Sequence, residues 1–325
     1  MARWPVFLAV ALILGPGLFA QNLKLEKTLS VPADTSVQFT AISAKGDFIA
    51  AACKDGRARL WTFPAGELRQ VLDLQDERIS GLWFSSDGNL LALGGARGSV
   101  KLWQLPSGKL KTQFKAAAEV NALAISPDRQ LLALAPSSES AQPAELWDLS
   151  DGKEITDLPA RFGPSTAVAF SPDNQRLALA DADTQIRFFE ANTGAPRGTN
   201  DDLLLEPFAV VFSADGKQVF VGGADKTISA IDVASGKVVA KFPKQSFVVW
   251  QLQLSQDGKF LAAAYVDERS FRNPAPILIW NIAEQKVRTT IQQPDVTPNG
   301  GAFLPDGRFL LTSSSDNLLK VWSVR

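Results

Sequence analysis

One feature recurs seven times along the chain: a short apolar segment that ends in an aromatic or other large apolar residue. The second residues of these endings are separated by steps of 42, 44, 42, 42, 49 and 42 residues. A period close to 42 that fills the whole chain indicates a repeat architecture with one supersecondary unit per period. The endings are Leu60-Trp61, Leu102-Trp103, Leu146-Trp147, Phe188-Phe189, Ala230-Ile231, Ile279-Trp280 and Val321-Trp322.

A tight-turn signal stands upstream of each ending. Asp followed by Gly or Asn supplies the positive φ angles that two-residue hairpin turns need. The signals are Ala44-Lys45-Gly46, Ser86-Asp87-Gly88, Pro127-Asp128-Arg129, Pro172-Asp173-Asn174, Ala214-Asp215-Gly216, Gln256-Asp257-Gly258 and Pro305-Asp306-Gly307.

Each period contains four short segments that alternate with turns. An apolar strand such as 168–171 precedes the Asp turn, and a small apolar strand such as 131–135 follows it. The third strand carries the aromatic residue, as in 100–103, and a Gly-Lys turn leads to a more polar fourth strand such as 109–114. Four antiparallel strands of this kind form one propeller blade. We therefore predict an all-β, seven-bladed β-propeller in a single domain that covers residues 21–325.

Three recurring strings resemble the WD40 repeat family: Ala-Phe-Ser-Pro-Asp at 169–173, Leu-Trp-Asp-Leu at 146–149 and Ser-Gly-Lys at 235–237. The resemblance covers essentially everything after residue 22. It implies the propeller fold and a role in binding other proteins, but it names no partner, because one fold serves many functions.

The chain departs from the WD40 pattern in one consistent way, because it contains no histidine. The Gly-His pair that usually opens a repeat is missing, and with it the hydrogen-bond network that joins His, Asp, Ser or Thr, and Trp in that family. We therefore expect apolar packing to be the main interaction that holds the blades together, with part of the polar network retained. An Asp six residues before the Trp position is expected to cap a tight turn in four blades, at Asp55, Asp183, Asp225 and Asp316.

The two ends of the chain complement each other. The sequence stops after the third strand of the seventh repeat, and residues 24–29 match the fourth-strand pattern of residues 109–114. We predict that this N-terminal strand completes the seventh blade, because an open ring would expose strand edges that promote aggregation.

Residues 1–20 have the pattern of a secretory signal peptide. Arg3 supplies a positive start, residues 6–14 are an apolar run, and a Gly-Pro-Gly break precedes Ala20. The apolar run is too short for a membrane anchor, which needs about 18 residues or more. We predict cleavage after Ala20 and export to the periplasm or the exterior, with no stable membrane insertion of the mature chain. Cys53, the single cysteine, lies in an apolar segment and is expected to be buried and inert.

The composition argues against most kinds of catalysis and metal binding. The 33 basic and 34 acidic residues give a net charge of −1, which offers no electrostatic case for nucleic acid or an anionic membrane. Without histidine there is no Ser-His-Asp triad and no His-ligated metal, and one cysteine cannot form a thiolate cluster. Asp181 and Asp183 fit a turn better than a cation site. We expect a protein that is not an enzyme, with no cofactor and no metal.

Two other functions stay open at this stage. One is a propeller enzyme such as a lactonase, a glycosidase or a quinoprotein-like dehydrogenase, which would need carboxylates or a metal at the mouth of the channel. The other is a receptor for a small ligand or a glycan.

Insertions point to a binding face. Both departures from the 42-residue period fall between second and third strands, at 136–143 and at 265–276. Insertions in repeat proteins commonly lie on the binding face, and aromatic and Arg side chains are enriched at binding hot spots. We therefore predict contact residues in the second insertion, which could also be a tolerated surface loop. They are Tyr265, Arg269, Phe271 and Arg272.

Aligned first strands give a second set of candidates near the rim of the channel. Five of the seven aligned positions are polar, and two adjacent ones are large aromatic residues that could form an apolar patch or turn into the core between blades. The ring reads Gln38, Ser80, Asn121, Thr166, Phe208, Trp250 and Asn299. Of these we predict Gln38, Asn121, Phe208, Trp250 and Asn299 as contacts for a protein partner of a monomeric propeller. Trp83 and the third-strand Trp residues are expected in the core.

Overall fold

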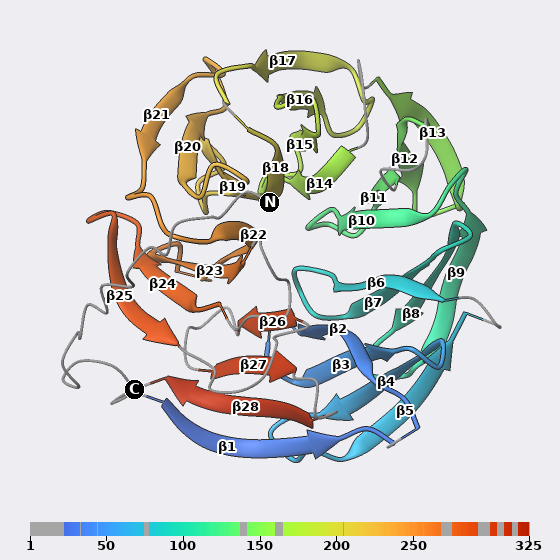
Figure 1. Cartoon of the computed structure of the whole chain (residues 1–325). Coiled ribbons are helices and arrows are strands. Elements are labelled where there is room, and N and C mark those ends of the chain that lie inside the picture. The colour runs from blue at the N-terminus through green and yellow to red at the C-terminus, as the bar shows by residue number, and fades with distance from the viewer. Residues whose placement is uncertain are drawn as a thin grey trace, which may run out of the picture.

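The computed structural model describes residues 23–324, except 33, 44, 75–77, 137–141, 160–164, 204, 256, 268–274, 292–299, 304–308 and 314–317. Within these residues the chain forms seven four-stranded antiparallel sheets, arranged around a central axis (Figure 1). The prediction of an all-β propeller with four-stranded antiparallel blades is confirmed. Within the described residues, no helix has the length and apolar character needed to cross a membrane.

Each sheet contributes one strand to each of four concentric positions. The first strands, nearest the axis, are β2 (Val37–Ile42), β6 (Ile79–Phe84), β10 (Val120–Ile125), β14 (Ser165–Phe170), β18 (Pro207–Phe212), β22 (Val248–Leu254) and β26 (Gly300–Phe303). The second strands are β3 (Phe48–Cys53), β7 (Leu90–Gly95), β11 (Leu131–Pro136), β15 (Arg176–Asp181), β19 (Gln218–Gly223), β23 (Phe260–Val266) and β27 (Phe309–Ser313). The third strands are β4 (Arg57–Thr62), β8 (Ser99–Gln104), β12 (Ala144–Asp148), β16 (Ile186–Glu190), β20 (Ile228–Asp232), β24 (Ile277–Asn281) and β28 (Leu318–Val324). The outer strands are β5 (Leu68–Asp73), β9 (Lys109–Lys115), β13 (Lys153–Leu158), β17 (Pro196–Asn200), β21 (Val238–Lys241), β25 (Lys286–Ile291) and β1 (Leu23–Ser30).

Burial follows this order. Second strands such as β3, β7 and β11 are buried on both faces, because each lies within its own sheet and between neighbouring sheets. Their sequences are accordingly runs of small and apolar residues, as expected for strands covered on both sides. Outer strands such as β9 alternate between half-buried and exposed residues, because one side of the strand faces solvent. The hydrophobic core is therefore distributed between blades.

The turn between the first and second strands repeats one hydrogen-bonding device. In blade two, the hydroxyl of the buried Ser85 donates to Asp87 Oδ1 at 2.6 Å and accepts from the Leu90 amide at 2.9 Å. The same pair of bonds recurs at Ser126, Ser171, Ser213 and Ser255. This device fixes the turns that the Asp signals predicted.

The seventh sheet contains both ends of the described chain. β1 pairs antiparallel with β28, with Lys24 opposite Ser323 and Leu29 opposite Leu319. The sheet order β1-β28-β27-β26 confirms that the N-terminal strand completes this blade (Figure 1).

Aromatic residues fill the spaces between blades as expected. Trp61, Trp103, Trp147 and Trp280 are buried in the third strands. Trp83 is half-buried, and its ring occupies the space that a side chain at residue 81 would need, so that position requires glycine. The Cys53 side chain is fully buried, and burial raises the pKa of its thiol.

Buried charged groups add to the apolar packing that holds the blades together. Glu145 is 4% exposed and accepts hydrogen bonds from the Trp147 indole at 2.7 Å and the Ala117 amide at 2.8 Å. Arg187 forms ion pairs with Asp181 and Asp183. These contacts give each of the buried charged groups a polar partner.

The predicted turn caps are present where the chain is described. The side chains of Asp55, Asp183 and Asp225 each accept a hydrogen bond from the amide two residues later, at 3.1, 3.3 and 3.0 Å. Asp183 thus lies in a turn, as the sequence predicted, whereas Asp181 is the last residue of β15 and precedes that turn. Asp316 lies outside the described residues.

Candidate protein-binding face

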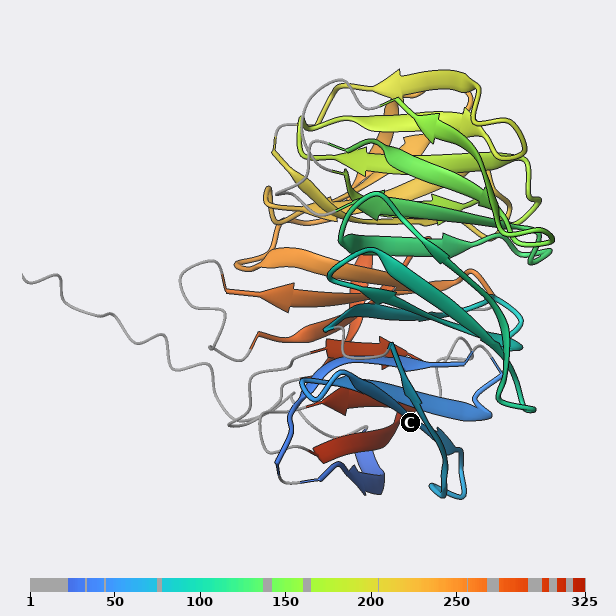
Figure 2. The same cartoon turned by 90° about the vertical axis from the view of Figure 1, so that its right-hand side faces the viewer.

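The strands run between two faces of the propeller, which the side view separates (Figure 2). We call top face the one formed by the connections between second and third strands and between successive sheets. The bottom face carries the turns from first to second strands and from third to outer strands. Each first strand begins at the top face and ends at the bottom face.

In six sheets a β-bulge lies near the beginning of the first strand, at the top face. The register between first and second strands skips one residue in each of these sheets. The skipped residues are Gln38, Ser80, Asn121, Thr166, Phe208 and Trp250, which are the aligned rim positions of the sequence. Bulges re-aim side chains and are frequent next to functional sites. The seventh aligned residue, Asn299, lies outside the described residues.

Three polar bulge residues link neighbouring blades. The Ser80 hydroxyl donates to the Val120 carbonyl at 2.6 Å, and the Thr166 hydroxyl donates to the Pro207 carbonyl at 2.6 Å. The amide of the exposed Asn121 donates to the Thr166 carbonyl at 3.5 Å. These bonds give the polar members of the ring a structural role. The contact role predicted for Gln38 and Asn121 stays a prediction.

The bulges of blades five and six carry aromatic rings in place of these polar links. The rings of Phe208 and Trp250 lie 5.3 Å apart between centroids and are inclined by 41°. Trp250 remains 50% exposed, whereas Phe208 is half-buried. The structure thus combines the two arrangements considered from the sequence, since the rings pack across the blade boundary and Trp250 also faces solvent.

Exposed apolar side chains are otherwise concentrated on the outer strands. Among the described residues, the exposed large hydrophobic residues outside those strands are Leu205, at 51%, and Trp250. Leu205 lies in the connection from β17 to β18, two residues before β18 begins. Leu205 was not among the contacts predicted from the sequence, although an apolar residue in a top-face connection is a signal that the sequence contains. We define the aromatic patch as Phe208 and Trp250, whose rings are in contact.

Tyr265 does not belong to the surface, and its prediction as a contact residue is wrong. Strand β23 continues to Val266, so Tyr265 lies within the sheet and is 2% exposed. Its hydroxyl accepts a hydrogen bond from the Trp280 indole at 3.3 Å, and burial raises the pKa of the phenol. Three other predicted contacts, Arg269, Phe271 and Arg272, lie outside the described residues.

No group of three or more His, Cys, Asp or Glu side chains that could hold a metal ion occurs in the part of the chain that the structure describes. Asp181 and Asp183 are engaged with Arg187, as described above. The described part of the top face presents the aromatic patch and the polar links between blades.

Comparison with known proteins agrees with the fold. Residues 43–126 match the model of the anaphase-promoting complex subunit 4 WD40 domain, and residues 290–323 match that of the WD domain, G-beta repeat. The chain is 25% identical over 298 residues to the WD repeat-containing protein WDS homolog of Arabidopsis thaliana, covering 88% of this chain and 55% of that protein. It is 25% identical over 182 residues to transcription factor unc-37 of Caenorhabditis elegans, covering 56% and 28% respectively. It is 24% identical over 220 residues to the protein LST8 homolog of Drosophila melanogaster, covering 65% and 67%.

The chain spans about half or less of the length of the first two of these relatives. The similarity therefore covers only part of each of these two proteins. The 42-residue repeat, the four-stranded antiparallel blades and these matches show that the chain belongs to the WD40-repeat family of β-propellers.

Proposed function

We propose that this propeller is a non-catalytic scaffold that binds a protein partner through the aromatic patch on its top face. The observation that carries the proposal is Trp250, which is 50% exposed at a bulge position where blades two to four carry a polar link. An exposed tryptophan beside a second ring supplies the rigid apolar area that protein interfaces use as an anchor.

Charged residues lie close in the sequence to the residues of the patch. Asp201 and Asp202 precede Leu205, and Lys244 precedes Trp250 in the connection into β22; all three are exposed. An apolar centre with a polar rim is the usual composition of a non-obligate interface. The absence of histidine and the burial of Cys53 argue against catalysis that uses a histidine base or a cysteine thiolate, which favours a binding role.

We expect Trp250→Ala to abolish partner capture without unfolding the protein. Loss of a central aromatic anchor typically costs about 2 kcal/mol or more of binding, which is roughly a thirtyfold loss of affinity. Melting temperature should change little because half of the side chain is already in solvent. The measurement is affinity capture from an envelope extract, compared with thermal unfolding of the same variant.

Val239→Ala is the matched control, since Val239 is 53% exposed on outer strand β21 and lies outside the patch. It should leave capture unchanged. A large fall in melting temperature for Trp250→Ala, with capture retained by the folded fraction, would assign Trp250 to the core and remove the patch from the proposal.

We also propose that the scaffold acts outside the cytoplasm. The positive start, the apolar run of residues 6–14 and the small residue Ala20 support a cleaved export signal. Mass spectrometry of the protein from fractionated cells should find a mature chain that begins at Gln21 in the envelope or medium. A chain that retains residues 1–20 in the cytoplasmic fraction would refute this part of the proposal.

A further inference from the structure

A depression on the bottom face gathers three cations from three successive blades. Its volume is about 720 Å³, within the usual range for small-molecule sites. Arg69 comes from β5 in blade one, Lys111 from β9 in blade two, and Arg129 from the turn between β10 and β11 in blade three. The depression lies at the opposite ends of the first strands from the aromatic patch, so its role is independent of the proposed protein binding.

Two of the cations occupy a special backbone position. Each outer strand has a β-bulge near the bottom face, and Arg69 and Lys111 are the residues that its register skips in blades one and two. The equivalent residues in blades three and five are Ile155 and Val239. The bulge residue is therefore charged in some blades and apolar in others.

Charged residues at the same bulge elsewhere are engaged. Arg197 of blade four forms an ion pair with Glu190, and the Arg288 guanidinium of blade six lies 4.5 Å from the centre of the Phe260 ring. By contrast, no ion pair or side-chain hydrogen bond joins Arg69 or Lys111 to another described residue. The two bulge cations at the depression are thus available to a ligand.

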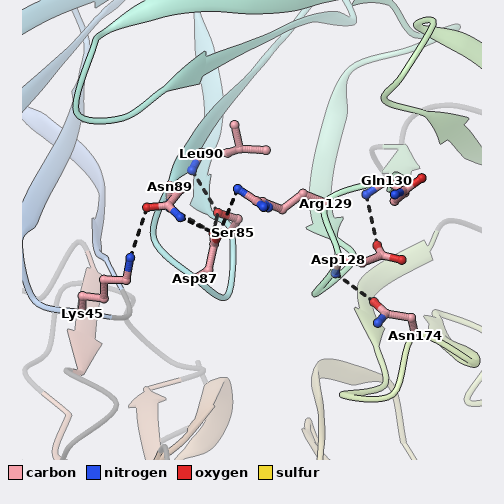
Figure 3. A network of polar contacts seen from close by, with 9 residues as sticks. All are labelled: Lys45, Ser85, Asp87, Asn89, Leu90, Asp128, Arg129, Gln130 and Asn174. Carbon is pink, nitrogen blue, oxygen red and sulfur yellow. Dashed lines mark hydrogen bonds and ion pairs between the residues drawn. The ribbon is translucent and has the colours of Figure 1, made fainter.

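The third cation is held in an unfavourable backbone conformation. Arg129 has a φ of 63°, at a turn position where blades one, two, five and six have glycine. A non-glycine residue in this region commonly marks strain that is retained for a functional reason. Its guanidinium reaches toward the blade-two turn, where it lies 3.2 Å from Asp87 Oδ2 (Figure 3).

Like charges are close together in the depression. Burial and the nearby charge of Arg129 lower the pKa of the Lys111 ammonium. The neighbouring carboxylates already accept hydrogen bonds within their turns. Asp128 accepts from the Gln130 amide, and Asp87 accepts from Ser85 and Asn89 (Figure 3). Asp128 also accepts from Ser126, and Asp148, whose charge acts on Lys111, accepts from the Ser150 amide. An anionic ligand would relieve this repulsion between the cations.

We propose that the depression is a binding site for the phosphate group of a small phosphate monoester. Three cations match the three acceptor oxygens and the charge of −1.5 to −2 that such a group carries near neutral pH. A carboxylate has two oxygens and one charge, and fits three donors less well. Leu105 and Pro106 in the lining offer an apolar seat for the group attached to the phosphate, and Gln104 and Ser107 offer polar contacts.

The experiment is calorimetric titration of the mature protein, at low salt, with phenyl phosphate and separately with inorganic phosphate. We expect both to bind, and phenyl phosphate to bind more tightly. Arg69→Gln and Lys111→Gln should each weaken binding about tenfold, because each removes one charge-assisted hydrogen bond to phosphate. Arg129→Gly should weaken binding to a similar degree while keeping the melting temperature, because glycine suits this φ.

Arg197→Gln is the matched control, since it removes a charge at the equivalent bulge of blade four. It should leave phosphate binding unchanged. If Arg197→Gln weakened phosphate binding as much as the other variants, the binding would be general electrostatic attraction and the proposed site would be wrong. The site would also be wrong if neither ligand bound at millimolar concentration. If phenyl phosphate and inorganic phosphate bound with equal affinity, the proposed apolar contact with the group attached to the phosphate would be wrong. If the protein co-sedimented with phosphatidate vesicles but did not bind phenyl phosphate, the ligand would be a lipid surface and the small-molecule proposal would be wrong.

Discussion

Deletion of residues 23–30 is expected to abolish the cooperative unfolding of the propeller. These residues form β1, the outer strand of the seventh sheet, and their loss exposes the unpaired edge of β28. Leu29 is 4% exposed and belongs to the core between blades seven and one, with Leu319 and Val321. Loss of one such side chain typically costs about 2 to 5 kcal/mol, a large share of the stability of a domain.

Thermal unfolding followed by circular dichroism and light scattering would measure this effect, and a circular permutation provides the matched control. Leu23 lies opposite Val324, so residues 23–30 placed after Val324 and joined by a short turn can form the same antiparallel pair. The deleted chain should aggregate or melt without a sharp transition, whereas the permuted chain should melt cooperatively. A sharp transition at an unchanged temperature in the deleted chain would mean that β1 does not hold the seventh blade.

Arg187→Met is expected to lower the free energy of unfolding by about 3 to 5 kcal/mol, because it leaves a buried carboxylate without its counter-charge. Asp181 is completely buried and forms an ion pair with Arg187. Its second support is the Ser165 hydroxyl, which donates at 2.8 Å. Asp183 pairs with the same guanidinium at 2.6 Å and is itself mostly buried. The measurement is the midpoint of denaturant-induced unfolding.

Two further variants separate the lost pairing from other effects. Lys153→Ala removes the ion pair with Asp151 on the surface and should leave the midpoint unchanged, since exposed pairs contribute little. Adding Asp181→Asn and Asp183→Asn to Arg187→Met removes the orphaned charges and should restore much of the lost stability. If Arg187→Met unfolds at the wild-type midpoint, the buried ion pairs do not stabilise blade four.

Local sequence signals were sufficient for the blades. The Asp turns and the small apolar second strands depend on neighbouring residues, and the described part of the structure has them where the 42-residue period places them. The pairing of β1 with β28 was also readable, because residues 24–29 repeat the outer-strand pattern and the seventh repeat lacked that strand.

Features that depend on neighbouring blades were not readable. Tyr265 was assigned to a loop because the insertion was measured from the period, whereas β23 extends to Val266 and buries the ring against Trp280. Glu145 and Arg187 are charged residues in third strands, and only the packed structure shows that they are buried with partners. Composition likewise gave no sign of the bottom-face depression, since its cations come from three repeats and are balanced by acids elsewhere in the chain.

The shared seventh sheet also sets an order of assembly. The other six sheets are each built from four consecutive strands, so each can form as soon as its own segment is available. β1 is made first, but its partner β28 is made last, and the seventh sheet therefore waits for almost the entire chain. Contacts so distant in sequence form slowly, and partly assembled chains expose apolar edges. Completion of the ring is thus the step at which a growing chain most needs protection from other copies of itself.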